Sequence, residues 1–288
     1  MHGVGPPLVT PFDENGAVDE SRLRELVAWV EDRGVEFLVP CGSNSEAELM
    51  TADERARVIE VVTEAASVPV LAGTGSPGLR ETTRATADAA AAGADAALVV
   101  TPFYYEHDQS ALADYYRTLA DRASIPIYLY SVPKYTDVRL DPETVATVAT
   151  HENVAGMKDS SGDLGAFVRT HRRTADEAFD LLIGSGSLLA QALDAGATGG
   201  VLALANVAPE QATAVYEIAC DDPAAARDHG AALVELNHAV TAAYGIPGLK
   251  YAMRRRGAPA GYARSPHEAP DEAARDRLDT LIDTLPDV

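Results

Sequence analysis

Eight short apolar segments recur through the first 205 residues, and they constrain the fold more than any other feature of the chain. They read as continuous apolar runs rather than as alternating ones, a pattern typical of parallel strands that are buried on both faces. The segments cover residues 4–10, 36–40, 69–73, 97–101, 126–130, 154–158, 181–184 and 200–204. We therefore expect eight parallel strands.

Amphipathic segments with helix start and stop signals separate these strands. Thr51 and Glu54 have the spacing of a capping box, and Gly34, Gly93 and Gly196 fall where helices should end. Repeated βα units in one chain imply a closed eight-stranded barrel or an open doubly wound sheet. Eight units favour the barrel.

The chain is predicted to be α/β, a TIM (β/α)8 barrel with additional C-terminal helices. Residues 1–206 would form the barrel core. Residues 207–288 show helical patterns and no strand signal, and no low-complexity linker precedes them. We expect them to pack on the barrel as part of a single structural unit.

The charge balance limits the kinds of partner that the protein can bind. Lysine and arginine total 23 against 44 acidic residues, a net charge of −21, which opposes binding to nucleic acid or to an anionic membrane. Arginine largely replaces lysine and the acids are spread along the chain, as on the solvated surfaces of halophilic proteins, so molar salt should stabilise the fold. With no signal sequence and no run of about 18 apolar residues, a cytoplasmic location is expected.

Nothing in the sequence indicates a metal or a cofactor. Cys41 and Cys220 are too sparse for a disulfide scaffold or a Cys-based zinc site, and the seven histidines neither cluster nor show His-Glu-x-x-His spacing. A P-loop and a Gly-x-Gly-x-x-Gly after the first strand are also missing. Residues 184–187, Gly-Ser-Gly-Ser, form either a simple turn or a phosphate cradle at a helix start.

Lys158 lies in an apolar run at the end of the sixth strand. A lysine there tends to be neutralised, paired, or used as an amine nucleophile, and a structural pair with Asp159 is the alternative. Tyr130 ends the preceding strand, so both side chains can reach the barrel mouth, where the polar residues of such barrels gather. Together they suit Schiff-base chemistry, with Ser43 and Tyr104 as further hydroxyls for proton relay.

The ordered strand-end motifs resemble the dihydrodipicolinate synthase and N-acetylneuraminate lyase family of pyruvate-dependent class I aldolases, nearly end to end. The matching segments are residues 7–12, 42–46, 73–75, 101–105, 130–133, 156–163 and 206–209. The resemblance implies a TIM barrel, usually a homotetramer, whose lysine forms an imine with pyruvate or another 2-oxo acid, without a cofactor.

The resemblance also implies roles for individual residues. Lys158 matches the Schiff-base lysine and Tyr130 the proton-shuttling tyrosine. Ser43 and Asn44 occupy the positions of a hydroxyl pair, and Tyr104 matches a tyrosine lent to a neighbouring subunit's site. The amides that follow Gly42 would bind the substrate carboxylate, while Gly184 and Val201 match positions that contact the substrate and the lysine.

Two departures from the synthase pattern bear on the substrate. Tyr135 stands where dihydrodipicolinate synthases have an arginine for the semialdehyde carboxylate, and Ser160 after the Lys-Asp pair looks like the sugar-acid members. His107 stands at the position where some of those enzymes have a phosphate-binding arginine. Three further arginines could bind an anion, or else form a solvated helix face or an interface: Arg254, Arg255 and Arg256.

These features predict a class I aldolase that cleaves 2-keto-3-deoxygluconate, or its 6-phosphate, to pyruvate and glyceraldehyde or its phosphate. Within the same family the alternatives are dihydrodipicolinate synthase, N-acetylneuraminate lyase and a sugar-acid dehydratase. An alternative of a different class is a catalytically silent homologue with a binding or regulatory role.

Overall fold

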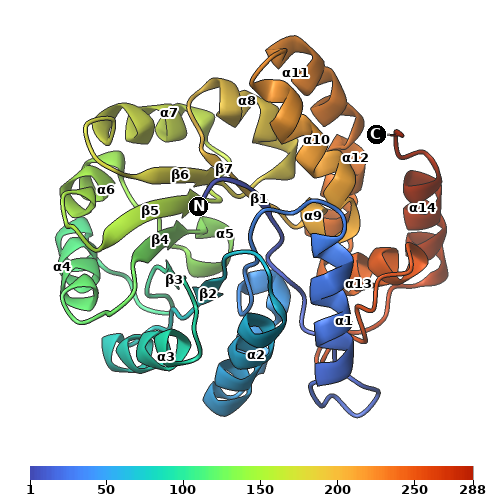
Figure 1. The fold of residues 1–288 in the computed structure, drawn as a ribbon, viewed down its shortest axis with the longest axis horizontal. Coiled ribbons are helices and arrows are strands. Elements are labelled where there is room, and N and C mark those ends of the chain that lie inside the picture. The colour runs from blue at the N-terminus through green and yellow to red at the C-terminus, as the bar shows by residue number, and fades with distance from the viewer. Residues whose placement is uncertain (288) are drawn as a thin grey trace.

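A computed structural model describes residues 1–287, which form a curled parallel sheet surrounded by helices (Figure 1). All strand pairs are parallel, in the order β1-β7-β6-β5-β4-β3-β2. The strands are β1 (Gly3–Gly5), β2 (Leu71–Gly73), β3 (Ala96–Val100), β4 (Ile127–Ser131), β5 (Val154–Asp159), β6 (Asp180–Ile183) and β7 (Gly199–Val201).

One predicted strand, residues 36–40, is present as a single parallel bridge between Leu38 and Val70 rather than as a regular strand. The segment still joins β1 to β2, because its backbone bonds both neighbours: the Glu36 N–H donates to the Val4 carbonyl (3.0 Å) and the Leu71 N–H to the Leu38 carbonyl (2.9 Å). Prolines interrupt the ladder, since they have no N–H to donate. They are Pro6, Pro7, Pro40 and Pro69. The barrel is therefore closed.

The helices that alternate with strands surround the sheet, and the C-terminal helices pack together at one side of it. In the barrel part of the chain the helices are α1 (Glu20–Glu31), α2 (Ala52–Ala65), α3 (Leu79–Ala91), α4 (Gln109–Ala120), α5 (Pro133–Thr136), α6 (Pro142–Ala149), α7 (Leu164–Arg173), α8 (Leu189–Asp194) and α9 (Leu204–Val207). Beyond it come α10 (Pro209–Ala219), α11 (Pro223–Ala232), α12 (Val234–His238), α13 (Gly245–Arg255) and α14 (Glu272–Asp283).

Short helices of other types interrupt this pattern. The 3-10 helices are η1 (Ser43–Ser45), η2 (Ala47–Leu49) and η3 (Gly186–Leu188), and a π-helical segment, η4 (Ala239–Ala243), precedes α13. Two predicted boundary signals are confirmed. Thr51 and Glu54 form a reciprocal capping box at α2, and Gly34, Gly93 and Gly196 follow helices with φ between 86° and 99°.

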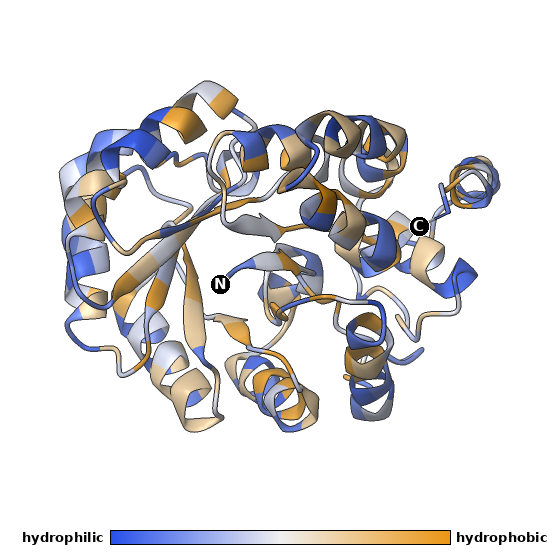
Figure 2. Ribbon diagram, turned by 45° about the horizontal axis from the view of Figure 1, so that its top comes forward, coloured by the Kyte–Doolittle hydropathy of each residue, from blue (hydrophilic) through white to orange (hydrophobic). Residues whose placement is uncertain are grey.

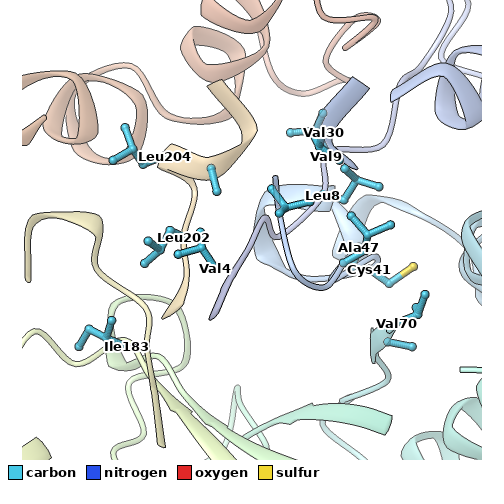
Figure 3. Packing of buried hydrophobic residues seen from close by; sticks show 14 of the residues in the cluster. Val4, Leu8, Val9, Val30, Cys41, Ala47, Val70, Ile183, Leu202 and Leu204 are labelled. Carbon is cyan, nitrogen blue, oxygen red and sulfur yellow. The ribbon is translucent and has the colours of Figure 1, made fainter. Parts of the chain in front are cut away.

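Buried apolar side chains form two groups, one inside the barrel and one between the barrel and the helices. The inner group includes Leu71, Tyr130, Leu182 and Val201. The outer group is larger; Figure 3 shows part of it, from Val4 and Leu8 to Leu202. In Figure 2 the surrounding helices carry both hydrophilic and hydrophobic colours, as amphipathic helices do. Each fully buried aliphatic side chain contributes about 1.5–3 kcal/mol.

The C-terminal helices are tied to the barrel by a buried ion pair between Lys250 on α13 and Glu46. Both side chains are fully buried. The Lys250 ammonium donates to the Glu46 carboxylate at 2.5 Å and to the carbonyls of Thr10 (2.6 Å) and Tyr262 (2.7 Å), which uses all three of its N–H groups. Burial lowers the pKa of Lys250 to about 8, although Glu46 opposes the shift.

The predicted arginine run is occupied by contacts within the chain. Arg254 donates to the Gly261 carbonyl, Arg255 pairs with Asp279 and Asp283, and Arg256 donates to the Val207 carbonyl (2.6 Å). These contacts hold the C-terminal segment together. Each of the three arginines thus has partners within the chain, and no anion ligand is needed to explain their presence.

Candidate active site

Tyr130 and Lys158 are adjacent at the carboxyl ends of β4 and β5. The two residues are paired in register, and both side chains point into the barrel, as expected from the alternation along each strand. The Lys158 side chain is buried, with the residue 3% exposed. Its ammonium lies 4.2 Å from the centroid of the Tyr130 ring. The sequence prediction that these two side chains meet is consistent with this geometry.

Lys158 has no carboxylate partner among residues 1–287. Within residues 1–287 no acidic oxygen lies within 4.0 Å of its nitrogen, so the alternative of a structural pair with Asp159 is wrong. Asp159 instead accepts a hydrogen bond from the Ser161 N–H at 2.7 Å, and burial raises the pKa of its carboxyl. Lys158 is therefore a buried amine without a salt bridge, the condition in which a lysine can serve as a nucleophile.

Helix η1 lies beside Tyr130. The Ser43 hydroxyl is 3.4 Å from the Tyr130 hydroxyl, a long contact of the kind that shortens when substrate is bound. The backbone N–H groups of Ser43 and Asn44 have no acceptor among the described residues. Two free N–H groups beside two hydroxyls can accommodate a carboxylate.

Buried hydrogen bonds hold the loop that carries these groups. The Ser45 hydroxyl donates to the Leu8 carbonyl (2.5 Å) and accepts from the Gly42 N–H (3.0 Å). Glu46, which ends η1, has a left-handed backbone with φ 58° and is held by Lys250. A left-handed backbone is uncommon for a residue with a side chain. The buried pair thus supports the conformation of the loop.

A cavity of about 570 Å³ opens above Tyr130. Loop 42–49 forms one wall, residues 130–136 another, and the C-terminal segments 241–247 and 266–267 a third. Gly42, Ser43, Tyr130 and Tyr135 of the predicted site lie on these walls. Lys158 does not, and neither do Asn44, Ser160, Gly184 and Val201.

The third wall of the cavity was not predicted from the sequence, nor were three of its charged or titratable residues, Lys134, Glu48 and His267. A signal for Lys134 was available, because it is one of three lysines in the chain and stands beside Tyr135. His267 could not be assigned from the sequence, since only the folded C-terminal segment brings it to the cavity, where its Nδ1 lies 3.1 Å from Glu46.

Ser160 and Gly184 are packed against each other at the ends of β5 and β6. A Cβ atom on Gly184 would lie 1.8 Å from the Ser160 hydroxyl oxygen, so this hydroxyl requires a glycine at 184. The Gly184 N–H donates to the Asp159 carbonyl at 2.7 Å. Val201 belongs to the same interior group of side chains as Tyr130.

Tyr104 and His107 are not brought to the site within one chain. Tyr104 is 85% exposed, has φ 79°, and packs edge-on against Tyr105 with 5.1 Å between ring centroids. His107 is exposed on the loop before α4. Neither residue lines the cavity.

The loop after β6 is a 3-10 turn. In it the Ser187 hydroxyl accepts a hydrogen bond from the Asn237 amide at 2.8 Å. Among the described residues, no group of three or more His, Cys, Asp or Glu side chains is arranged to hold a metal ion. Likewise, none of the described helices is long and apolar enough to cross a bilayer.

The chain matches the Dihydrodipicolinate synthetase family over residues 1–285. It is 39% identical over 291 residues to an uncharacterised DapA-like lyase of Halobacterium salinarum, covering 99% of this chain and 94% of that one. It is 35% identical over 295 residues to the 4-hydroxy-tetrahydrodipicolinate synthase of Haloarcula marismortui, with the same coverage.

Among solved structures, it resembles a prophage protein of the dihydrodipicolinic acid synthase family from E. coli K12 in complex with pyruvate. The TM-score is 0.94 and the identity 27%, covering 99% of this chain and 98% of that one. Enzymes of this family are carbon–carbon lyases that form a lysine Schiff base with pyruvate and need no cofactor. By its barrel, by its strand-end motifs and by these matches, the chain belongs to the dihydrodipicolinate synthetase family of class I aldolases.

Proposed function

We propose that this enzyme cleaves 2-keto-3-deoxygluconate, its 6-phosphate, or both, to pyruvate and glyceraldehyde or its phosphate. One observation carries the reaction type: the unpaired Lys158 amine lies under the Tyr130 ring, and the Tyr130 hydroxyl reaches Ser43. This arrangement supplies a nucleophile and a hydroxyl relay at one point of the barrel mouth.

In this mechanism the Lys158 amine attacks the C2 carbonyl, and the carbinolamine loses water to give an iminium. The Tyr130 oxygen then takes the proton of the C4 hydroxyl while the C3–C4 bond breaks and its electrons move into the iminium. The aldehyde leaves and an enamine remains. Protonation at C3 and hydrolysis release pyruvate and restore the amine, with Ser43 passing protons to and from Tyr130.

The substrate proposal depends on two positions. Tyr135 lies on the cavity wall, at the position of the synthase arginine. Ser160 lies at the end of β5 beside Gly184, outside the cavity lining, and its hydroxyl is the proposed partner of a polyol chain. The names of several relatives favour a second candidate, 4-hydroxy-tetrahydrodipicolinate synthase, which would condense pyruvate with aspartate semialdehyde.

The assembly proposed is a homotetramer in which Tyr104 completes the relay of a neighbouring subunit. The exposed position of Tyr104 in one chain supports this role, because a relay tyrosine that is absent from its own cavity must act elsewhere. His107, three residues later, would then also approach a neighbour's site.

Borohydride trapping with pyruvate tests the imine. The expected result is a mass increase of one reduced pyruvate located at Lys158, and its loss in Lys158→Ala. Lys134→Gln provides the matched control, because it removes another of the three lysines. Lack of trapping in the wild-type protein would sink the imine mechanism and favour a catalytically silent homologue.

A substrate panel tests the specificity. Pyruvate release is measured from 2-keto-3-deoxygluconate and from its 6-phosphate, beside condensation of pyruvate with aspartate semialdehyde. We expect release from at least one sugar acid. If aspartate semialdehyde alone reacted, the synthase candidate would replace the aldolase proposal.

A further inference from the structure

The cavity above Tyr130 contains few charged side chains. Those on its walls, among the described residues, are Lys134, Glu46 and Glu48, together with the titratable His267. The Glu46 carboxylate is neutralised by Lys250 and is fully buried. This leaves Lys134 as the one lysine or arginine on the cavity walls, among the described residues.

Lys134 is held at the rim by the fold. It lies in α5, directly after the strand that carries Tyr130, with Pro133 at the helix start. Its ammonium donates to the Thr241 carbonyl of the π-helical segment at 3.0 Å and lies 5.3 Å from the Tyr135 ring centroid. The carbonyl uses one of its three N–H groups, so two remain for a ligand.

The surroundings make this cation matter more than a surface lysine usually does. The chain has a net charge of −21, which repels anions on average, so anion binding requires a local positive group. An ammonium accepts carboxylate and phosphate alike, because it acts as a point charge, whereas an arginine fork favours bidentate partners. A lysine at this rim can therefore bind either kind of anion.

We propose that Lys134 binds the distal anionic group of the aldehyde half of the substrate, so that the site prefers aldehydes carrying phosphate or carboxylate over neutral ones. The inference rests on the proposed function and names its substrate class. Lys134 sets specificity at the end of the substrate that is remote from Lys158.

Glu48 provides an opposing charge in the same cavity. It lies in η2, on the wall contributed by loop 42–49. Burial raises the pKa of its carboxyl, with Arg55 opposing. A carboxylate there repels an anionic tail, so Glu48 and Lys134 should act on the same preference with opposite signs.

The test compares aldehydes in the condensation direction with pyruvate. Glyceraldehyde 3-phosphate carries a phosphate, aspartate semialdehyde a carboxylate, and glyceraldehyde no charge. The measured quantity is the ratio of kcat/KM for an anionic aldehyde to that for glyceraldehyde, so a general loss of folding cancels. Lys134 is exposed at the rim, so the loss of its charge should lower the ratio about two- to fivefold in Lys134→Gln.

Two further variants sharpen the result. Lys134→Arg retains the charge and should retain the preference, and Glu48→Gln should raise the ratio. The anion giving the larger ratio in the wild-type protein identifies the source, phosphate or carboxylate. An unchanged ratio in Lys134→Gln, or an equal loss with all aldehydes, overturns the assignment of Lys134.

Pyruvate trapping on each variant separates this proposal from the proposed function. If pyruvate is trapped, the wild-type enzyme condenses aspartate semialdehyde far faster than either sugar aldehyde, and the ratio falls in Lys134→Gln, Lys134 is supported and the sugar-acid proposal fails. If pyruvate is trapped and the ratio does not change, only the Lys134 assignment fails. A wild-type enzyme that traps pyruvate but condenses with no aldehyde overturns both.

Discussion

At the scale of single residues, Tyr130 offers two parts of one side chain to the reaction. Its ring lies 4.2 Å from the Lys158 nitrogen, and its hydroxyl lies 3.4 Å from the Ser43 hydroxyl. A ring face attracts an ammonium or iminium by about 0.5–2 kcal/mol, while the hydroxyl can carry a proton. Removing the hydroxyl alone separates these contributions.

Tyr130→Phe should keep the ring against Lys158 and abolish the relay. We expect kcat for aldol cleavage to fall roughly 10²- to 10⁴-fold, the range for loss of a general acid–base group, while pyruvate is still trapped at Lys158. Steady-state pyruvate release and borohydride trapping measure the two effects. Tyr244→Phe is the control, since Tyr244 lines the same cavity and has no assigned role in the reaction. An equal loss in both variants would contradict the role given to Tyr130.

At the scale of elements, the Lys250–Glu46 pair joins α13 to the loop between η1 and η2. The residues are 204 positions apart in the sequence, and both side chains are fully buried. Removing one partner leaves a buried charge without compensation, which typically costs 3–5 kcal/mol, about ten times the value of an exposed pair. The pair therefore couples the C-terminal helices to the loop that would hold the substrate carboxylate.

Lys250→Met should lower the free energy of unfolding by about 3–5 kcal/mol, measured by urea denaturation at fixed protein concentration. Adding Glu46→Gln to Lys250→Met should recover part of the loss, because the uncompensated carboxylate is gone. The control is Arg169→Met, which removes an exposed partner of Glu143 and should cost at most about 1 kcal/mol. If Lys250→Met were no more costly than Arg169→Met, the coupling would be refuted.

Elements that depend on local patterns could be predicted from the sequence. The capping box at Thr51 and the positions of Tyr130 and Lys158 at strand ends follow from residue order alone. The segment 36–40 was expected as a full strand, and prolines in it and its neighbours reduce it to a bridge. The Lys250–Glu46 pair and the C-terminal wall of the cavity could not be predicted, because they depend on how distant segments pack.

At the scale of the whole molecule, one chain leaves the proposed relay incomplete. Tyr104 is 85% exposed, is held at φ 79° and lines no wall of its own cavity. The barrel places it on an outer loop, between β3 and α4, together with the exposed Tyr105. A second copy that docks there would receive the Tyr104 hydroxyl, so the assembly would be part of the active site.

Mixed assemblies test this arrangement directly. Lys158→Ala subunits keep Tyr104, and Tyr104→Phe subunits keep Lys158, so the site of a Tyr104→Phe subunit can be completed only when a Lys158→Ala subunit lends it Tyr104. With even mixing and one lent tyrosine per site, about a quarter of the sites should regain the wild-type set in a symmetric oligomer. Pyruvate release is measured before and after mixing, with sedimentation velocity to determine the assembly. Mixing Tyr104→Phe with Lys158→Ala/Tyr104→Phe subunits should restore nothing. A fully active wild-type monomer, or mixed oligomers no more active than their parents, would show that Tyr104 is not shared.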